Sequence, residues 1–198
     1  MHISEGILSP PVIAAGWALT AGGLAVGLKK TPPEKLPETA LVSASLFLAS
    51  LVHVPLGPSS IHLTLLGLAG VLLGWSAVPA LFIALFLQGI LFQFGGLLSL
   101  GVNTAVMGTA ALAGGGAYRA ALSKTPPRLR FLPAFVAGFI AVIVGTTLVC
   151  AALFFSDMDL QATAALLFAA NLPLAAAEGL ISAFIIAFLS KTVPQYVS

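Results

Sequence analysis

The chain has 198 residues, of which 59% are apolar and 7% are charged, and its mean hydropathy is +1.10. Ordinary soluble domains carry about 25% charged residues, so this composition excludes a soluble globule. The formal net charge of +2 and the scattered basic residues argue against nucleic acid as a partner. The single cysteine, Cys150, excludes a disulfide framework and a thiolate metal site. The composition therefore predicts a polytopic membrane protein.

The first residues, Met-His-Ile-Ser-Glu-Gly, contain no Lys or Arg and carry Glu5. A cleavable signal peptide begins with a basic region, so we expect the mature chain to begin at or near Met1. Seven apolar segments follow along the sequence. They cover residues 10–28, 40–54, 61–75, 78–94, 102–122, 132–155 and 162–189.

The distribution of charge favours seven membrane spans. A helix that crosses the hydrocarbon core needs about 17–25 residues, so the second, third and fourth segments look short. The alternative is one long helix over the third and fourth segments, kinked at Pro79. Seven spans with an external N-terminus place all eight basic residues, within 29–35 and 119–130 and at Lys191, on the cytoplasmic side. The merged helix would place the 119–130 cluster outside. We therefore predict an all-α protein of seven transmembrane helices, with the N-terminus outside and the C-terminus cytoplasmic.

Residues 39–118 contain no charged side chain, and their connecting loops are built from Pro, Gly, Ser, Asn and His. Such loops either fold inward, where irregular backbone must be buried in protein or line a cavity, or form short tight turns. The sequence leaves both alternatives open. The run Gly114-Gly115-Gly116 lacks the strand-then-helix context of a phosphate loop and predicts a flexible or closely packed helix end.

His2 is an unusual candidate metal ligand because it directly follows the chain's first residue. With Met1 retained, the α-amine, the His2 peptide nitrogen and His2 Nδ1 can close fused five- and six-membered rings on one metal, provided the peptide nitrogen is deprotonated. One more imidazole completes a square-planar site of four nitrogens, which favours Ni(II) or Cu(II) and also admits cobalt. Mg(II) is excluded because it requires oxygen ligands. The alternative is that His2 is a solvated terminal residue.

The fourth nitrogen is expected on the same external face, in the segment 53–62 between the second and third apolar segments. This segment offers His53 and His62. Its prolines and hydroxyls predict a shaped loop that enters a helix, with Ser59 or Ser60 as the N-cap. Because the chain has only three histidines, a histidine facing His2 is a better interpretation than an ordinary loop residue.

Three motifs carry a family resemblance. They are Met1-His2-Ile3-Ser4-Glu5-Gly6, the pattern Pro-Leu-Gly-Pro-Ser-Ser-Ile-His62-Leu-Thr-Leu, and Gln93-Phe94-Gly95-Gly96 followed by Leu100-Gly101-Val102-Asn103-Thr104 and Met107-Gly108. They resemble the CbiM/NikM family, the substrate-binding S-components of energy-coupling-factor (ECF) nickel and cobalt transporters. The resemblance covers essentially the whole chain. It implies a single integral-membrane metal-binding domain over residues 1–198, in the inner (plasma) membrane of a prokaryote.

The resemblance also implies a set of ligands. Met1 supplies its amine, His2 its peptide nitrogen and imidazole, and His62, by its position in the motif, the fourth nitrogen. His53 then orients a ligand through a hydrogen bond, and Gln93 and Asn103 line or close the site without binding metal.

A buried carboxyl group is expected in the last span. Some family members carry a histidine before the last-span glutamate, but this chain has Asn171-Leu-Pro173 before Glu178, so that histidine's role does not carry over. An unpaired carboxylate in the middle of a span is costly, so we expect Glu178 to be protonated or hydrogen-bonded. A structural role is favoured over a role in relaying metal.

The resulting hypothesis is a metal-capture subunit with Ni(II) or Co(II) as the transported substrate, with no organic cofactor and no catalytic residues. The chain has no P-loop, so ATP hydrolysis is expected in separate ATP-binding A-components. The resemblance implies a coupling transmembrane T-component and a small auxiliary membrane subunit as further partners in the lipid bilayer.

Two alternatives belong to other classes of protein. An intramembrane hydrolase could use Ser59 or Ser60 with His53 or His62, but no orienting carboxylate lies nearby in the sequence. A stand-alone secondary transporter or channel predicts inverted repeats, and the sequence shows no convincing repeat.

Overall fold

The computed structural model describes residues 2–51, 53–56, 59–156 and 161–194. Each of the seven predicted apolar segments overlaps one α-helix in this part of the chain. The helices are α1 (Pro10–Lys29), α2 (Leu36–Ala49), α3 (Leu66–Leu73), α4 (Ala77–Phe92), α5 (Leu100–Leu122), α6 (Phe131–Ser156) and α7 (Gln161–Thr192). The other elements are the strands β1 (His53–Leu56) and β2 (Ser59–His62) and the short 3-10 helices η1 (Pro33–Lys35), η2 (Gly74–Ser76) and η3 (Pro127–Leu129).

The helices have the length and composition of a membrane protein. Four stretches among the described residues are long and apolar enough to cross a bilayer. They are Pro10–Lys29, Leu66–Phe92, Phe131–Ser156 and Ala165–Thr192. The predicted α-helical membrane fold is thus confirmed, while the seven-span topology and its orientation stay predictions.

The stretch Leu66–Phe92 is broken into α3 and α4 at Gly74, not at Pro79. Gly74 ends α3 with a φ of +57°, a backbone conformation that glycine adopts without strain, and η2 follows directly. Pro79 is the third residue of α4, where a proline is tolerated because its missing N–H has no helical partner. The eight residues of α3 are about 12 Å long, far less than the hydrocarbon core of about 30 Å.

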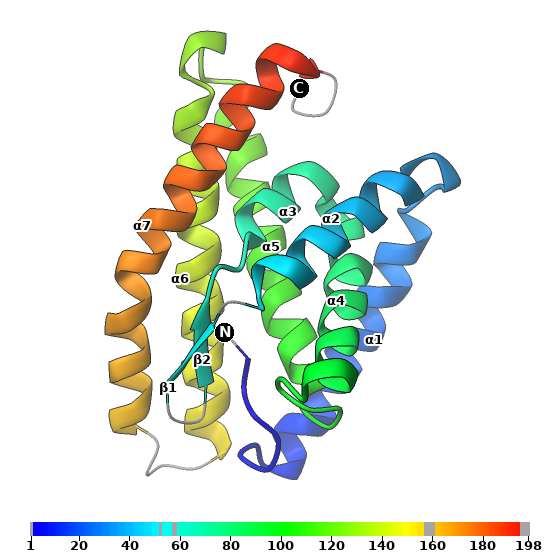
Figure 1. Ribbon diagram of the computed structural model, residues 1–198, viewed down its shortest axis with the longest axis vertical. Coiled ribbons are helices and arrows are strands. Elements are labelled where there is room, and N and C mark those ends of the chain that lie inside the picture. Colours follow the sequence, from blue (N-terminus) through cyan, green and yellow to red (C-terminus); the bar gives the residue numbers. More distant parts are fainter. Residues whose placement is uncertain (1, 52, 57–58, 157–160, 195–198) are drawn as a thin grey trace.

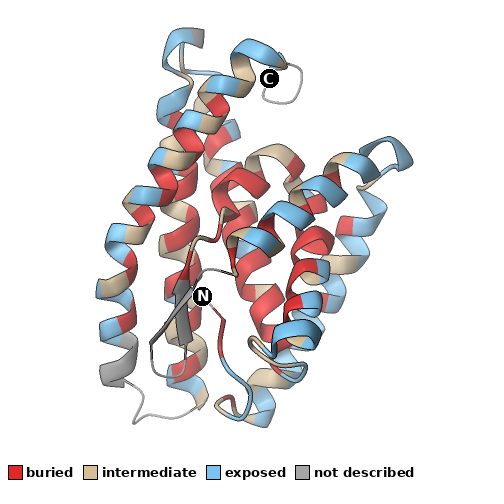
Figure 2. Cartoon of the chain, in the orientation of Figure 1, coloured by how far each residue is buried: buried red, intermediate tan, exposed pale blue. Residues whose placement is uncertain are grey.

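α5 runs through the middle of the bundle and contacts α1, α3, α4 and α6, while α7 packs along α6 (Figure 1). The short helix α3 has six buried residues out of eight. Figure 2 shows the buried residues gathered on α3 and on the inward faces of α5 and α6. Large apolar side chains on the outside, such as Leu19 on α1 and Phe184 on α7, are exposed and suit a lipid environment.

Glycines allow α3 to approach its neighbours closely. A Cβ atom added at Gly67 would lie 2.5 Å from Gly138 Cα of α6, and one added at Gly70 would overlap the Ala111 carbonyl of α5. The run 114–116 lies inside α5 rather than at a helix end, which corrects that part of the prediction. Gly114 and Gly115 do pack closely, against α6 and α3, whereas a Cβ at Gly116 would meet nothing within 4 Å.

The segment between α2 and α3 forms a short antiparallel hairpin in which His53 pairs with His62. The predicted N-cap role of Ser59 or Ser60 is wrong, because both residues lie in β2 and α3 begins only at Leu66. The segment leading into α3 is folded inward, since His62 and Thr64 are buried. Figure 1 shows the hairpin and the N-terminal segment side by side at the same end of the bundle. The inward-folded alternative for this uncharged segment is therefore the one the structure supports.

Candidate metal-binding site

The start of the chain is held in the bundle by a side-chain amide of α5. Ile3 N donates a hydrogen bond to Asn103 Oδ1 at 2.9 Å, and Asn103 Nδ2 donates one to the Ile3 carbonyl at 3.1 Å. One side chain thus satisfies both backbone groups of Ile3, which is fully buried and would lose stability with either group unpaired. This pairing fixes the residue next to His2, so Asn103 acts on the predicted site through the backbone.

Two further contacts hold the N-terminal segment. Leu98 N donates to the Glu5 carboxylate at 3.0 Å, and Ser9 N donates to Ser156 Oγ at 3.1 Å. The loop after α4 passes close to this segment because Gly95 and Gly96 have positive φ angles of +79° and +92°. A Cβ added at Gly96 would lie 2.5 Å from a Glu5 carboxylate oxygen. The motif glycines therefore make room for the chain's first residues.

His2 and His62 are brought together by these anchors. Their imidazole rings stack with centroids 4.6 Å apart and an interplanar angle of 14°. Their exposed fractions are 5% and 3%, so the pair is buried inside the bundle. His2 is contributed by the N-terminal segment and His62 by the end of β2. The structure thus brings together the two side chains that the sequence predicted as metal ligands.

The contact of His62 with its neighbour favours one tautomer of the imidazole. His62 Nδ1 lies 3.0 Å from the Leu63 carbonyl oxygen. A carbonyl oxygen can only accept a hydrogen bond, so a hydrogen bond in this contact requires the proton on Nδ1. In that tautomer the lone pair of a neutral imidazole is on Nε2.

Glu178 of α7 binds the segment that joins His62 to α3. Its carboxyl group accepts hydrogen bonds from Thr64 N, from Thr64 Oγ1 at 2.9 Å and from Leu65 N at 2.9 Å to each oxygen. Leu65 is the N-cap of α3 and has a φ of +52°, uncommon for a residue with a side chain. A carboxyl group suits this place because the N–H groups at a helix start lack backbone acceptors and carry a partial positive charge. The hydrogen-bonded state predicted for Glu178 is confirmed.

The other predicted site residues have different outcomes. Gln93 is exposed and ends α4 in the left-handed conformation with a φ of +58°, so its role in lining the site stays a prediction. His53 lies opposite His62 in the hairpin, but its side chain is outside what the structure describes. Met1 also lies outside the described residues, so the predicted amine ligand stays untested.

Sequence reasoning did not assign three residues that shape the site. Glu5 and Thr64 are both in the quoted motifs, but a motif alone does not say which backbone group each side chain meets. Ser99 donates from Oγ to the Gly95 carbonyl at 2.5 Å and accepts from Asn103 Nδ2 at 3.4 Å, which supports the Asn103 amide. Serine and asparagine four residues apart at a helix start are the signal that could have indicated this pair.

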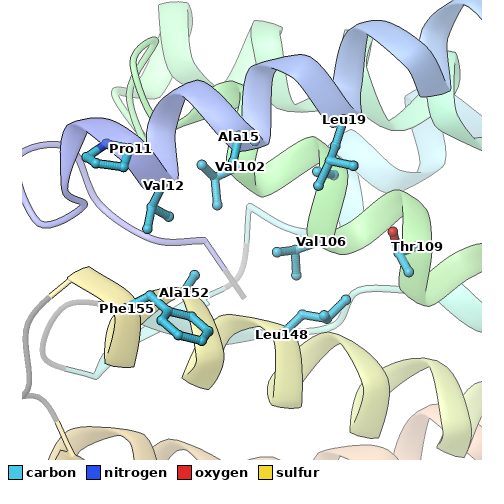
Figure 3. A pocket seen from close by; sticks show the side chains of 12 residues that line it. Pro11, Val12, Ala15, Leu19, Val102, Val106, Thr109, Leu148, Ala152 and Phe155 are labelled. Carbon is cyan, nitrogen blue, oxygen red and sulfur yellow. The ribbon is translucent and has the colours of Figure 1, made fainter.

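Metal donors are sparse in the described part of the chain. No group of three or more His, Cys, Asp or Glu side chains lies together among these residues, and the histidine pair supplies two imidazoles. A separate groove of about 490 Å³ lies between α1, α5 and α6 (Figure 3). It is lined by apolar side chains such as Val12, Val106 and Phe155, and by Thr109, so it resembles a lipid-facing groove more than a metal site.

Known proteins with similar sequences are metal transport proteins. A "Putative metal transport protein" of Haemophilus influenzae is 44% identical over 145 residues, which cover 73% of this chain and 69% of the relative. The "Cobalt transport protein CbiM" of Sorangium cellulosum is 31% identical over 98% of this chain and 93% of its own length. The "Fused nickel transport protein NikMN" of Rhodobacter capsulatus is 38% identical over 52% of this chain, a region that spans 31% of that longer protein.

A solved structure and a family profile agree with these relatives. A crystal structure of a truncated transition metal transporter has a TM-score of 0.86 and 27% identity, and the match covers 97% of this chain and 99% of the other. Residues 2–196 match the profile described as "CbiM: Cobalt uptake substrate-specific transmembrane region". This family consists of metal transporters rather than enzymes, so the hydrolase alternative finds no support. The chain belongs to the CbiM family of substrate-specific transmembrane regions for cobalt uptake.

Proposed function

We propose that this chain is the metal-capture subunit of an energy-coupling-factor uptake transporter and binds Ni(II) or Co(II) from the external side. The observation that carries the proposal is the buried contact between His2 and His62, whose rings lie 4.6 Å apart. Buried polar side chains in a membrane protein are costly and mark substrate or ion sites. Two imidazoles held together by anchored backbone are a suitable start for a site that binds a nitrogen-preferring metal.

The proposed ligands are the Met1 amine, the His2 peptide nitrogen, His2 Nδ1 and His62 Nε2. The rings of His2 and His62 lie nearly parallel, so one of them must turn before both can direct a nitrogen at the same ion. His62 is held at Nδ1 by the Leu63 carbonyl. His2 is therefore the ring that turns, and it does so as its own peptide nitrogen and the amine close the chelate. A square plane of four nitrogens favours Ni(II) among the divalent metals that this family transports.

The residues around these ligands have supporting roles in this proposal. Asn103 holds Ile3, and through it the His2 peptide unit, by two hydrogen bonds. Gln93 lies in the loop that passes over the N-terminal segment and closes the site when metal is bound. His53 orients a ligand from the neighbouring strand, opposite His62 in the hairpin. No organic cofactor is required.

A subunit that only captures the ion needs partner subunits to move it across the membrane. We propose a coupling transmembrane T-component, ATP-binding A-components that hydrolyse ATP, and a small auxiliary membrane subunit. The names of two fused relatives, NikMN and the "Putative fused cobalt transport protein CbiMQ" of Methanocorpusculum labreanum, support a partnership with other transport components. The matches cover 52% and 56% of this chain and 31% and 20% of the two fused relatives.

The proposed placement is a single domain over residues 1–198, crossing the inner (plasma) membrane seven times. The connections α1–α2 and α5–α6 and the end of α7 lie at the same end of the bundle (Figure 1). These three places, with the adjoining last turns of α1 and α5, carry all eight basic residues of the chain. The excess of Lys and Arg on the cytoplasmic side of membrane proteins supports this end as cytoplasmic. The hairpin and the N-terminal segment then face outside, where the metal is taken up.

Metal titration of chains with different first residues tests the proposal. The chelate requires a free amine directly before His2, so one extra residue ahead of Met1 moves that amine out of reach. We expect tight Ni(II) binding by the purified native chain in isothermal calorimetry and its loss in the extended chain. A tag after Ser198 is the matched control and should leave binding unchanged. Equal tight binding by the extended chain would contradict the terminal chelate, and no binding by the native chain would contradict metal capture.

A further inference from the structure

One peptide unit connects the candidate ligand His62 to a carboxyl group from the last helix. The carbonyl of Leu63 contacts His62 Nδ1 at 3.0 Å, and the N–H of the same peptide unit, on Thr64, donates to Glu178. The three groups thus form a chain from the carboxyl through the peptide to the imidazole. His62 and Glu178 are 116 positions apart in the sequence, and this single peptide plane lies between them.

We propose that Glu178 is a positioning residue for His62. Acting through the Leu63–Thr64 peptide, it holds His62 in the tautomer with the proton on Nδ1, and so presents the Nε2 lone pair to the transported metal. This inference rests on the proposed function for its metal. The hydrogen-bond chain itself is a property of the folded protein before metal binds.

The physical basis is the polarisation of the peptide by the carboxyl group. A carboxyl oxygen that accepts the Thr64 N–H draws charge through the amide and makes the Leu63 carbonyl a stronger acceptor. The stronger acceptor holds the Nδ1 proton of His62 more firmly. Partners that accept the second N–H of a metal-binding histidine fix its tautomer and ring orientation and raise its basicity.

The carboxyl group is itself held rigidly. Thr64 Oγ1 and Leu65 N donate to it at 2.9 Å, in addition to the Thr64 N–H. Glu178 is fully buried, so water does not compete for these bonds. A Cβ added at Gly138 of α6 would lie 2.6 Å from the Glu178 carbonyl oxygen, which shows how closely α7 packs there. The backbone that carries Glu178 is therefore packed tightly against α6.

The Glu178→Gln variant tests this role with nearly the same side-chain shape. The amide has one acceptor oxygen, and its NH2 group faces N–H donors of Thr64 or Leu65, so part of the hydrogen-bond set is lost. We expect Ni(II) affinity by calorimetry to fall about 10- to 100-fold, the usual effect of removing such a supporting partner. The matched control is Asn171→Leu, because Asn171 is also buried on α7 but its side-chain Nδ2 donates within the helix, to Leu167 O. This control should bind Ni(II) like the unchanged chain.

The Thr64→Val variant separates the effect of the Thr64 N–H bond to Glu178 from that of the Thr64 hydroxyl bond. It removes the hydroxyl bond to Glu178 and keeps the Thr64 N–H. We expect a smaller loss of affinity than in Glu178→Gln, with the His62 tautomer retained. A loss as large as that of Glu178→Gln together with a changed tautomer would contradict a relay through the peptide.

Nitrogen NMR of the metal-free chain gives a readout that a purely structural role would not move. The chain has three histidines, so a spectrum of 15N-histidine-labelled protein contains few signals, and His2→Ala and His53→Ala variants assign them. We expect His62 in the Nδ1–H tautomer in the unchanged chain and a mixture of tautomers in Glu178→Gln. A His62 with the proton on Nε2 in the unchanged chain would overturn the inference, even if the Glu178 variant fails to fold.

The two readouts separate this inference from the proposed function. Absence of Ni(II) binding by the unchanged chain would contradict the function, while the tautomer measurement still tests the link between Glu178 and His62. Tight binding that is equal in the unchanged chain and in a folded Glu178→Gln variant, with an unchanged tautomer, would overturn the inference alone.

Discussion

At the residue scale, the site depends on side chains that satisfy buried backbone groups. Asn103 pairs with both backbone groups of Ile3, and Glu178 accepts the N–H groups that precede α3. Irregular backbone survives at membrane depth only where such partners exist, because no water is present to replace them. The two histidines are thus placed by neighbouring backbone that is fixed from other helices, α5 in one case and α7 in the other.

The Asn103→Leu variant tests the anchor of the N-terminal segment. Leucine has a similar shape but leaves the Ile3 N–H and C=O without this partner, at a cost of about 1–3 kcal/mol for each buried group that stays unpaired. We expect the N-terminal segment to detach from the bundle for part of the time. The apparent Ni(II) affinity then falls in proportion to the fraction of chains that are still competent to bind, at least about tenfold. Calorimetry measures this loss. An affinity equal to that of the Asn171→Leu variant would show that the anchor does not preorganise the site.

The pair of histidines could be predicted from the sequence, but the hydrogen bonds that hold the pair in place could not. Three histidines in 198 residues, one at position 2 and one before an apolar segment, leave few ways to build a nitrogen site. The bond between Thr64 and Glu178 joins residues 114 positions apart, and no local spacing or periodicity encodes such a contact. The exposure of Gln93 at the left-handed end of α4 could not be predicted from its place in a motif, and its role in closing the site stays a prediction.

At the element scale, α3 is the buried helix that follows the His62 segment of the candidate site. It begins four residues after His62 and is buried between α5 and α6. Its close contacts use glycines on both sides, so that backbone meets backbone with no side chain between, as is common between membrane helices. A helix of eight residues gains little stability from its own hydrogen bonds. Its position must therefore come from these contacts and from the hydrogen bonds that Thr64 and Leu65 donate to Glu178.

Adjacent glycines of α5 provide a matched test of this packing. A Cβ at Gly115 would overlap the Gly70 carbonyl of α3, whereas a Cβ at Gly116 meets nothing within 4 Å. We expect Gly115→Ala to destabilise the protein by about 1–3 kcal/mol, as overpacking does. Gly116→Ala should be neutral or stabilise the protein by up to about 1 kcal/mol, because alanine favours the helix. Melting temperatures in detergent measure both; a Gly115→Ala variant as stable as Gly116→Ala would contradict the close contact of α3 with α5.

The helices followed from hydropathy more easily than the pieces between them. Each apolar segment overlaps a helix because long apolar runs must satisfy their backbone internally in a membrane. The segment 53–65 combines prolines, serines and β-branched residues, which are compatible with both a loop and short strands, so its hairpin was not predicted. The seven-segment prediction placed a break between residues 75 and 78, close to the observed break at Gly74–Ser76. Only the merged alternative placed a kink at Pro79, which at the start of α4 is tolerated.

At the scale of the whole molecule, charge is segregated along the long axis. The basic connections α1–α2 and α5–α6 lie at one end, and the loop after α4 lies at the other end with the N-terminal segment (Figure 1). The described part of that loop contains no charged residue, while the α5–α6 connection carries Lys124, Arg128 and Arg130. This asymmetry is what orients membrane proteins, because Lys and Arg are retained on the cytoplasmic side.

Cysteine labelling in intact cells tests the resulting orientation. In a Cys150→Ser background, which removes the chain's single cysteine, Leu97→Cys places a thiol in the loop after α4 and Lys124→Cys places one after α5. Both positions are exposed, so access depends on the side of the membrane. We expect a membrane-impermeant maleimide to label the Leu97→Cys variant in intact cells and the Lys124→Cys variant only after the membrane is opened. A single span over Leu66–Phe92 would reverse this pattern, because it would move the loop after α4 inside and the basic connection outside. An inverted bundle would give the same reversed pattern, because the loop after α4 is bonded to the N-terminal segment through Leu98 N and Glu5. His2 and His62 would then lie toward the cytoplasmic side, so the labelling pattern also tests the proposed side of metal entry.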